Sequence, residues 1–441
     1  MHIVVIGSGL AGLTAAISLR KAGHEVDIVE AAAAIGYIGA GIQVSPNSSR
    51  VLRHLGVDKY LEKYVLEPID LKMMSWKSGE VLVHVPLKEP AKEYGSPYWH
   101  IHRADLHRGL QSCAIAYGCR VHLDSRVVDI NPNKPSLTTK NGAVFTPDLI
   151  VASDGLHSYA RSVVVGKLAP PVPTGQMCYR ITLPVEKLEH IPDLDDFIKV
   201  SRNNHWLGPH GTILSYLLKS DHGILINFVF TCDANMPEGV NQRISSSQEA
   251  RKAFKDWDPR VVSMLEYVDD VLEWRLFTHK ELPTWSHESS KLVLIGDAAH
   301  AMTPYLAQGS AMGIEDAGIL GGILTKYPTT ETLPQSLALY EKLRIKRTAK
   351  VTAASIESRH YTQMNDGPEQ RARDAYLLAN PGILKGHQHI RSQTEFLDDL
   401  FGYNFLKELE RGFEESADEF SPEGPAVLKE KIRPAPLVVK A

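Results

Sequence analysis

Three glycines near the N-terminus have the spacing of a turn that binds phosphate. Gly7, Gly9 and Gly12 form the pattern GxGxxG, and Glu30 follows after the next apolar stretch. In such a turn the first glycine permits a tight bend, the second lets backbone N–H groups approach a pyrophosphate, and the third lets a helix lie close to a strand. A carboxylate at Glu30 can accept hydrogen bonds from ribose hydroxyls and argues against a 2′-phosphate there. The pattern therefore predicts a dinucleotide-binding turn.

A second stretch combines one acidic residue with a run of small ones. The segment LVLIGDAAHAMTPYLAQGSAMGIEDAG begins at Leu292 as an apolar strand, turns at Gly296, and then carries few bulky side chains. Asp297 alone could cap a helix, the commonest role of an aspartate after a turn. His300 could be a histidine whose hydrogen bonds are satisfied inside the core. The run as a whole indicates that something must approach this backbone closely.

Local patterns place these residues at the ends of strands. The predicted strands are His2–Ile6, Glu25–Val29 and Leu149–Ala152, and the predicted helix between the first two is Leu13–Ala22. A strand, a glycine-rich turn, a helix and a second strand form a βαβ unit, in which the helix N-terminus directs its positive dipole at the phosphates. The third strand leads into Asp154-Gly155, as the segment at Leu292 leads into Gly296-Asp297.

These three motifs, taken in order, resemble those of the class A flavoprotein monooxygenases, the family with the p-hydroxybenzoate hydroxylase fold. The resemblance covers about residues 1–347. It implies an α/β fold in which a Rossmann-like FAD-binding domain of the glutathione-reductase type is joined to a mixed β-sheet substrate domain and C-terminal helices. It also implies FAD as the cofactor, NADH or NADPH as the co-substrate, and O2 as the oxidant.

The resemblance assigns roles to individual residues. Asp297 would hold the ribityl chain of FAD, and Arg103 would reach its pyrophosphate or ribityl region. Asp154 is expected near the diphosphate and the path of NAD(P)H, while Gln43 is expected in the loop that lines the flavin. Either Val127 or Val128 is a candidate neighbour of the adenine. The expected cofactor residues are Gly7, Gly9, Leu10, Ala11, Gly12, Glu30, Gln43, Arg103, Val128, Asp154, Asp297, Pro304, Gly309, Ser310, Ala311 and Met312, the last four through the backbone that meets the pyrimidine edge.

The region between the second and third motifs alternates apolar and polar residues, which is typical of strands. The predicted strands are Met177–Thr182, Phe197–Ser201, Thr212–Leu218 and Gly223–Phe230, the predicted helices are Gln248–Phe254 and Val261–Tyr267, and Trp206–Pro209 is a predicted turn. These strands would form a mixed sheet that covers the flavin.

Three side chains in this region are candidates for binding an aromatic substrate. A cation or a hydrogen-bond donor beside a phenol lowers its pKa and raises its nucleophilicity. Arg180 and Tyr216 occupy strand positions similar to those of the arginine and tyrosine that bind phenols in fungal relatives of the family. Arg180 would stabilise a phenolate or carboxylate, Tyr216 would orient the ring oxygen, and His210 could relay a proton. Alternatively, Tyr216 packs within the sheet and His210 is a solvated turn residue.

The activity implied is hydroxylation of a phenolic or hydroxybenzoate-like aromatic through a flavin C4a-hydroperoxide. The segment from Tyr305 to Asp316 resembles that of salicylate hydroxylases, which leaves open whether CO2 is lost during hydroxylation. One alternative is a flavoprotein monooxygenase that acts on a larger polyketide or alkaloid. Another, of a different class, is a non-catalytic binding protein of the GDP-dissociation-inhibitor type.

The composition of the chain limits the classes of molecule that it is expected to bind. The chain has 441 residues, 43% of them hydrophobic, and a formal net charge of -4, so it has no basic stripe to attract nucleic acid. Its four cysteines lack zinc-site spacing, so no metal is expected, and their scarcity favours a reducing, cytoplasmic location. No apolar run is long enough to predict a membrane span. The expected partner is a small aromatic substrate, and the chain is expected to be a monomer or a homodimer.

The motifs also suggest how the chain is divided. The predicted FAD-binding domain comprises residues 1–72, 96–172 and 290–360, and the predicted substrate domain comprises residues 73–95 and 173–289. Residues 361–441 would form a C-terminal helical segment that ends, from about Ser421, in an extended tail rich in Pro, Glu and Lys.

Overall fold

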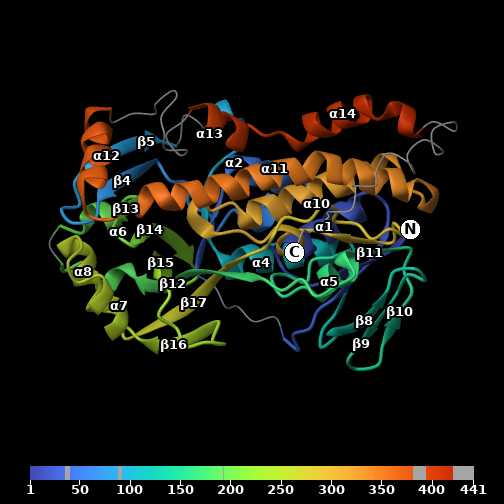
Figure 1. Cartoon of the computed structure of the whole chain (residues 1–441), viewed down its shortest axis with the longest axis horizontal. Helices are drawn as coiled ribbons and strands as arrows, with labels where there is room; N and C mark the ends of the chain where they lie inside the picture. Colours follow the sequence, from blue (N-terminus) through green and yellow to red (C-terminus); the bar gives the residue numbers. More distant parts are fainter. Residues whose placement is uncertain (35–39, 88–91, 192, 381–393, 421–441) are drawn as a thin grey trace, which may run out of the picture.

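The computed structural model describes residues 1–34, 40–87, 92–191, 193–380 and 394–420. The expected tail from Ser421 onward lies outside the described residues. Figure 1 shows an elongated molecule in which a parallel sheet and a larger, mostly antiparallel sheet lie toward opposite ends of the long axis.

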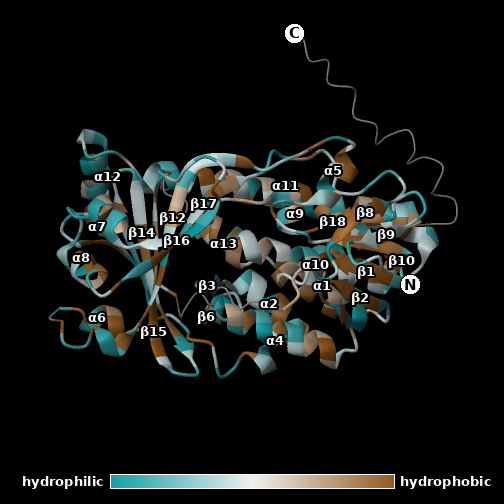
Figure 2. Ribbon diagram, turned by 90° about the horizontal axis from the view of Figure 1, so that it is seen from below, coloured by the Kyte–Doolittle hydropathy of each residue, from teal (hydrophilic) through white to brown (hydrophobic). Residues whose placement is uncertain are grey.

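A parallel sheet of five strands follows the spatial order β18-β11-β1-β2-β7. Its strands are His2–Ile6 (β1), Glu25–Val29 (β2), Arg120–His122 (β7), Leu149–Ala152 (β11) and Leu292–Leu294 (β18). Ile3, Val4 and Val5 are fully buried, as expected in a parallel sheet that is covered on both faces. Figure 2 accordingly shows β1 and β18 as hydrophobic.

The expected βαβ unit is confirmed. The three predicted strands have the observed bounds, and β1 pairs in parallel with both β2 and β11. The helix α1, Leu10–Lys21, begins three residues earlier than predicted. The glycine-rich turn is therefore shorter than the motif, because Gly12 already belongs to the first turn of the helix.

The second sheet contains eight strands in the order β16-β17-β12-β15-β14-β13-β4-β5. Its strands are Asp70–Ser75 (β4), Val81–Pro86 (β5), Val172–Pro184 (β12), Asn203–Gly208 (β13), Gly211–Ser220 (β14), Gly223–Asp233 (β15), Gln242–Ser246 (β16) and Asp270–Thr278 (β17). Neighbours pair antiparallel except β13 and β4, which are parallel, so the prediction of a mixed sheet is confirmed.

Two local predictions in this region are wrong. The predicted strand Phe197–Ser201 begins inside a short helix, α6 (Asp195–Ile198), where Phe197 packs against Trp206 with 5.4 Å between ring centroids. The predicted turn Trp206–Pro209 is mostly strand, because β13 extends to Gly208. The strand that β13 pairs with in parallel, β4, lies more than a hundred residues earlier, so no local pattern could show this pairing.

Smaller sheets and helices complete the fold. The remaining strands are Gly41–Val44 (β3), Trp99–His102 (β6), Val127–Asn131 (β8), Ser136–Thr139 (β9) and Val144–Phe145 (β10). The remaining helices are Pro46–His54 (α2), Arg103–Ala116 (α4), Tyr159–Val165 (α5), Gln248–Ala253 (α7), Pro259–Leu265 (α8), Asp297–His300 (α9), Gly309–Lys326 (α10), Leu333–Thr362 (α11), Pro368–Ala379 (α12), Thr394–Phe401 (α13) and Phe405–Glu415 (α14). The long helix α11 runs along the molecule between the two sheets (Figure 1).

Within the described part of the chain, none of the helices combines the length and the apolar character needed to cross a bilayer.

Candidate active site

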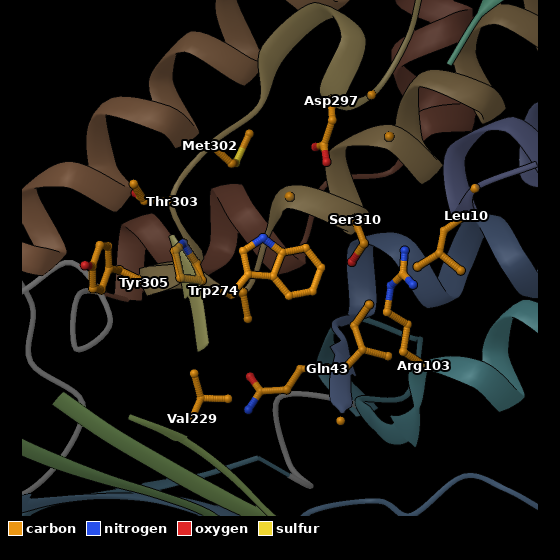
Figure 3. Close-up of a pocket in the computed structure, with 18 of the residues that line it drawn as sticks. Leu10, Gln43, Arg103, Val229, Trp274, Asp297, Met302, Thr303, Tyr305 and Ser310 are labelled. Carbon is orange, nitrogen blue, oxygen red and sulfur yellow. The ribbon is translucent and has the colours of Figure 1, made fainter. Parts of the chain in front are cut away.

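A cavity of about 430 Å³ lies between the two sheets. One wall is formed by the N-terminus of α1 and the turn before α9, and the opposite wall by one face of the eight-stranded sheet. Figure 3 shows the indole of Trp274 in the middle of this space, with Asp297 and Arg103 on one side of it and Val229 and Tyr305 on the other. The cavity therefore has a half near the parallel sheet and a half near the larger sheet.

The glycine-rich turn opens onto the cavity. Gly7 has a φ of 92°, which favours glycine. A Cβ on Gly12 would lie 2.1 Å from the Gly7 carbonyl oxygen and 2.3 Å from Ser153 Oγ, so the close approach of α1 requires glycine there. A Cβ on Gly9 would meet no atom within 4 Å. Gly9, Leu10, Ala11 and Gly12 line the cavity, so the N–H groups at the start of α1 lie where an anionic ligand can reach them.

Glu30 lies at the end of β2, where it supports the turn. Its Oε2 accepts hydrogen bonds from Ser8 N at 2.8 Å and from Ser8 Oγ at 2.7 Å, and its Oε1 accepts one from Ala32 N. Burial alone would raise the pKa of Glu30, but these hydrogen bonds outweigh it and lower the pKa. The residue is therefore an ionised acceptor beside the glycines, although it is not among the residues that line the cavity.

Asp297 places an accessible carboxylate in the cavity. Its side chain points inward (Figure 3), and its accessible surface faces the cavity while protein surrounds it on the other sides. Burial raises the pKa of this carboxyl, and the charges of His300 and Arg103 oppose that rise. No hydrogen bond to the Asp297 carboxylate is found among the described residues. A ligand that carries hydroxyl groups would supply the missing donors.

Buried ion pairs hold the turn that carries Asp297. Asp316 accepts hydrogen bonds from Gly296 N at 2.9 Å and from Arg344 Nε at 2.7 Å, and His300 Nε2 lies 2.6 Å from its Oδ2. From the other side, Arg161 Nη1 donates to the Ala299 carbonyl oxygen at 2.7 Å. His300 is thus a buried histidine whose Nε2 pairs with Asp316, while its Nδ1 has no partner among the described residues.

The small residues after Asp297 serve two purposes. Gly309 and Ser310 line the cavity, as expected for a backbone that approaches a ligand. Gly313, however, also allows close helix packing, because a Cβ there would lie 2.8 Å from Ala11 Cβ. Ala311 and Met312 are buried and do not line the cavity, which differs from the expectation for these two residues.

Gln43 and Arg103 both line the cavity. Gln43 Nε2 donates to Asn203 Oδ1 at 2.6 Å, and Tyr98 Oη donates to Gln43 Oε1 at 2.7 Å, so the amide has a fixed orientation. Burial and the nearby charge of Arg180 lower the pKa of Arg103, while Asp297 opposes this effect. The guanidinium groups of Arg103 and Arg180 and the carboxylate of Asp297 therefore line one cavity, and Arg103 interacts electrostatically with the other two groups.

The sheet contributes alternate residues, because every second side chain of a strand points to the same face. The cavity-lining residues of the sheet are Arg180 (β12), His205 (β13), Thr212, Leu214 and Tyr216 (β14), Val229 and Thr231 (β15), and Trp274 (β17). Cross-strand pairing aligns His205, Leu214, Val229 and Arg180 in one row across four strands. This wall combines apolar surface with a few polar groups, as small-molecule sites do.

Arg180 and Tyr216 both have polar atoms without protein partners. Arg180 Nη2 donates weakly to the Gly41 carbonyl oxygen at 3.4 Å, its Nε is buried with no partner, and no carboxylate pairs with it among the described residues. Tyr216 is buried, its ring lies 4.5 Å from that of His100, and its hydroxyl has no hydrogen bond within the described part of the chain. Burial raises the pKa of Tyr216, so its hydroxyl is a neutral donor.

Besides Gly7, Glu30, Ala311 and Met312, three further expected site residues do not line the cavity. His210 is exposed on the turn between β13 and β14 with a φ of 56°, and its Nδ1 lies 3.2 Å from Asp233 Oδ2, so it is a solvated turn residue and not a proton relay at the site. Val128 is exposed on β8. Asp154 accepts hydrogen bonds from Ser158 Oγ and Ala160 N at the start of α5, while its neighbours Ser153 and Gly155 line the cavity.

Several cavity residues had no individual signal in the sequence. Once Tyr216 is placed on the cavity face, the period of two along a strand identifies Leu214 and Thr212. Trp274 could not be found in this way, because its position depends on the antiparallel register between β17 and β12.

Comparison with known proteins agrees with this geometry. The model of the FAD binding domain family matches residues 1–355. The FAD-dependent monooxygenase OpS4 of Beauveria bassiana (strain ARSEF 2860) is 34% identical over 384 residues, covering 86% of this chain and 90% of that protein. The 3-amino-4-hydroxybenzoate 2-monooxygenase PtmB3 of Streptomyces platensis is 35% identical over 375 residues, covering 85% and 91%. A solved salicylate hydroxylase–substrate complex has the same fold, with a TM-score of 0.75 at 22% identity, covering 93% of this chain and 98% of that chain.

Proposed function

Because the chain belongs to the class A FAD-dependent aromatic monooxygenases, which use NAD(P)H and O2, we propose that it hydroxylates a small aromatic anion held by Arg180. The substrate class is a phenol or a hydroxybenzoate. Family membership confirms the FAD, NAD(P)H and O2 expected from the sequence, and it shows that the alternative of a non-catalytic binding protein is wrong.

The residues near the parallel sheet fit FAD. The open space at Gly9, the N-terminus of α1 and Arg103 suit a pyrophosphate, and the carboxylate of Asp297, which has no donor of its own, suits the hydroxyls of a ribityl chain. When bound there, FAD would supply the redox chemistry, namely hydride acceptance from NAD(P)H and O2 activation. The overall reaction converts a ring C–H, O2, NAD(P)H and a proton to a ring C–OH, water and NAD(P)+.

The proposed substrate class rests on one observation, which is that the guanidinium of Arg180 has no anionic partner among the described residues. Arg180 is half-buried and its Nε is enclosed without an acceptor, so an anionic ligand in the cavity would supply the missing acceptor. Arg103 adds a second positive charge nearby. The relative PtmB3 is named for a substrate with a carboxylate and a phenol on one ring, which is the chemistry such a pair would select.

The other sheet residues would position the ring and exclude water. Tyr216 would donate its hydroxyl proton in a hydrogen bond to a ring oxygen, since its raised pKa keeps it neutral. The apolar side chains of Leu214, Val229 and Trp274 would enclose the ring. Trp274 also lies at the centre of the cavity, where it limits how large a substrate can be (Figure 3).

The test is substrate-stimulated NAD(P)H oxidation by the holoenzyme, with H2O2 and CO2 measured, for phenol, benzoate, salicylate and 3-hydroxybenzoate. We expect a hydroxybenzoate to stimulate oxidation without equivalent H2O2. Release of one CO2 per turnover would show that the ring carbon attacked carries the carboxylate. If no compound in the panel stimulates oxidation, the substrate class is wrong and a larger polyketide or alkaloid becomes the better candidate.

Substitution of Arg180 tests its role directly. Arg180→Met should weaken binding of the active hydroxybenzoate by about 2 kcal/mol, roughly thirtyfold in Kd, because a charged hydrogen-bonding partner is lost. Arg180→Lys is the matched control that retains the charge and should lose less. FAD absorbance and the thermal unfolding temperature should stay close to those of the wild type. Unchanged KM in the methionine variant would remove Arg180 from the substrate site.

A further inference from the structure

A second, smaller cavity of about 30 Å³ lies beside the active site. Eight of its ten lining residues are apolar. The lining residues are Leu71, Val85, Leu87, Tyr98, Asn203, Leu306, Phe396, Leu397, Leu400 and Phe401. Its walls therefore come from the edge of the eight-stranded sheet, from the turn after Thr303, and from α13.

The helix α13 closes this cavity and is itself held in place. Four of the lining residues belong to α13, and Phe396, Leu397 and Leu400 are each buried. Tyr94 Oη donates to Asp398 Oδ1 at 2.7 Å, and Arg347 Nη2 donates to the Leu400 carbonyl oxygen at 3.3 Å. The cavity is thus a defined part of the packed structure.

The two cavities share a thin wall. Gln43 lines the active-site cavity, and its side chain is hydrogen-bonded to Tyr98 and Asn203, which both line the smaller cavity. Leu306 lines the smaller cavity, while its neighbours Tyr305 and Ala307 line the larger one. A molecule in the smaller cavity is therefore about one side chain away from the active site.

The chemistry of the small cavity disfavours water. A buried water takes two to four hydrogen-bond partners, whereas apolar cavities stay dry and bind small apolar molecules such as xenon. The polar groups here are largely occupied, since Tyr98 Oη donates to Gln43, and Asn203 Oδ1 accepts from Gln43 and lies 3.0 Å from His100 Nε2. Asn203 Nδ2 is buried without a partner, so its amide N–H groups face no protein acceptor, but this one side chain cannot by itself surround a water with two to four partners.

We propose that this cavity binds dioxygen and supplies it to the active site past Gln43 and Leu306. The enzyme consumes O2, which is apolar and little larger than water, so its size and polarity match the space. The cavity, at about 30 Å³, is too small for an aromatic substrate.

The first test needs no catalysis. The wild-type holoenzyme, crystallised and pressurised with xenon, should show a xenon atom between α13 and β5. The variant Leu397→Phe should lose that atom because the added ring atoms fill the space. No xenon in the wild-type cavity would overturn the proposal.

The second test measures the reaction with O2 without an aromatic substrate. Photoreduced holoenzyme is mixed with oxygenated buffer, and the rate of flavin reoxidation is followed by absorbance. In Leu397→Phe this rate should fall several-fold while KM for NAD(P)H stays unchanged. Leu409→Phe is the matched control, because Leu409 is a buried leucine on α14 that lines neither cavity. Equal rates in Leu397→Phe and the wild type would overturn the proposal.

If Leu397→Phe fails to fold, two other measurements test the same cavity. Val85→Leu fills less of the cavity and should show smaller changes in the same direction. Xenon pressure on the wild type should slow reoxidation by competing with O2, and the absence of slowing would count against the proposal. A rise in KM for the aromatic substrate with an unchanged rate of reoxidation would identify the cavity as a substrate subsite instead.

Discussion

At the scale of single residues, the site is defined by polar groups that lack protein partners. Asp297 and Arg180 both face the cavity: the carboxylate accepts no hydrogen bond from the described residues, and Arg180 Nε is buried without an acceptor, whereas folded proteins usually pair such buried groups. Each therefore indicates a ligand: hydroxyls for the carboxylate and an anion for the guanidinium. By contrast, both oxygens of Asp316 and of Glu315 accept hydrogen bonds, including one to each residue from Arg344, and their role is to hold the backbone of the site.

Substitution of Asp297 should separate binding of FAD from stability. We expect Asp297→Asn to weaken FAD binding by about 2 kcal/mol, roughly thirtyfold in Kd, since a charged acceptor is lost. Titration of the apoprotein with FAD, followed by flavin fluorescence, measures this change. An unchanged Kd would exclude Asp297 from the FAD site.

The same variant has an expected pH signature. Burial raises the pKa of Asp297 above its usual 3.8, so its contribution to stability is present below that value and is lost as pH rises through the raised pKa. The Asn variant has no carboxyl group there, so its folding carries no free-energy cost of burying an ionised carboxylate. Its apoprotein should therefore be at least as stable as the wild type at about pH 8, in urea unfolding, and should lose that advantage at about pH 3.

At the scale of elements, α1 shows how glycine positions distinguish packing from binding. Gly12 is required because α1 approaches the first turn of the motif closely, whereas Gly9 has open space where its side chain would be. Both positions belong to one sequence motif, but only the structure shows that they meet different physical demands.

Two alanine substitutions test this distinction. Gly12→Ala should destabilise the protein by about 1–3 kcal/mol, because its Cβ overlaps the Gly7 carbonyl oxygen. Gly9→Ala should unfold like the wild type, since its φ of −66° suits alanine, but should bind FAD more weakly. Denaturant unfolding of the two apoproteins and FAD titration give both quantities. Equal effects of the two substitutions on stability would contradict this interpretation.

At the scale of the whole molecule, buried carboxylates with lowered pKa values connect distant segments. Burial alone would raise the pKa of Asp316, but its interactions with His300, Arg344 and Gly296 lower it to about 2. Burial is likewise outweighed at Asp27, where hydrogen bonds from Arg120, His122 and His2 lower the pKa. At Glu315, burial would also raise the pKa, and the charges of Arg347 and Arg344 lower it instead.

These groups predict acid sensitivity. A carboxyl whose pKa is lowered by folding stabilises the native state above its unfolded value, 3.8 for Asp and 4.5 for Glu, and that contribution is lost as pH falls through the folded pKa. The free energy of unfolding should therefore decrease steeply from about pH 5 to about pH 2. Guanidinium unfolding across that range measures the slope, and Asp27→Asn should make it shallower. A slope that does not change in this variant would contradict the role of Asp27.

The sequence by itself determined the parts of the protein that local spacing controls. The βαβ unit and the places of Glu30 and Asp297 at strand ends could be predicted, because glycine geometry and strand ends are local features of the chain. Arg180 is expected in the site only from the resemblance to the family, and the structure places it in the cavity lining. The tertiary structure alone decided which face of each strand meets the cavity. It excluded His210, turned Ala311 and Met312 away, and brought Trp274 to the centre through the register of β17 against β12. Register and packing depend on segments far apart in the chain, so no local pattern contains them.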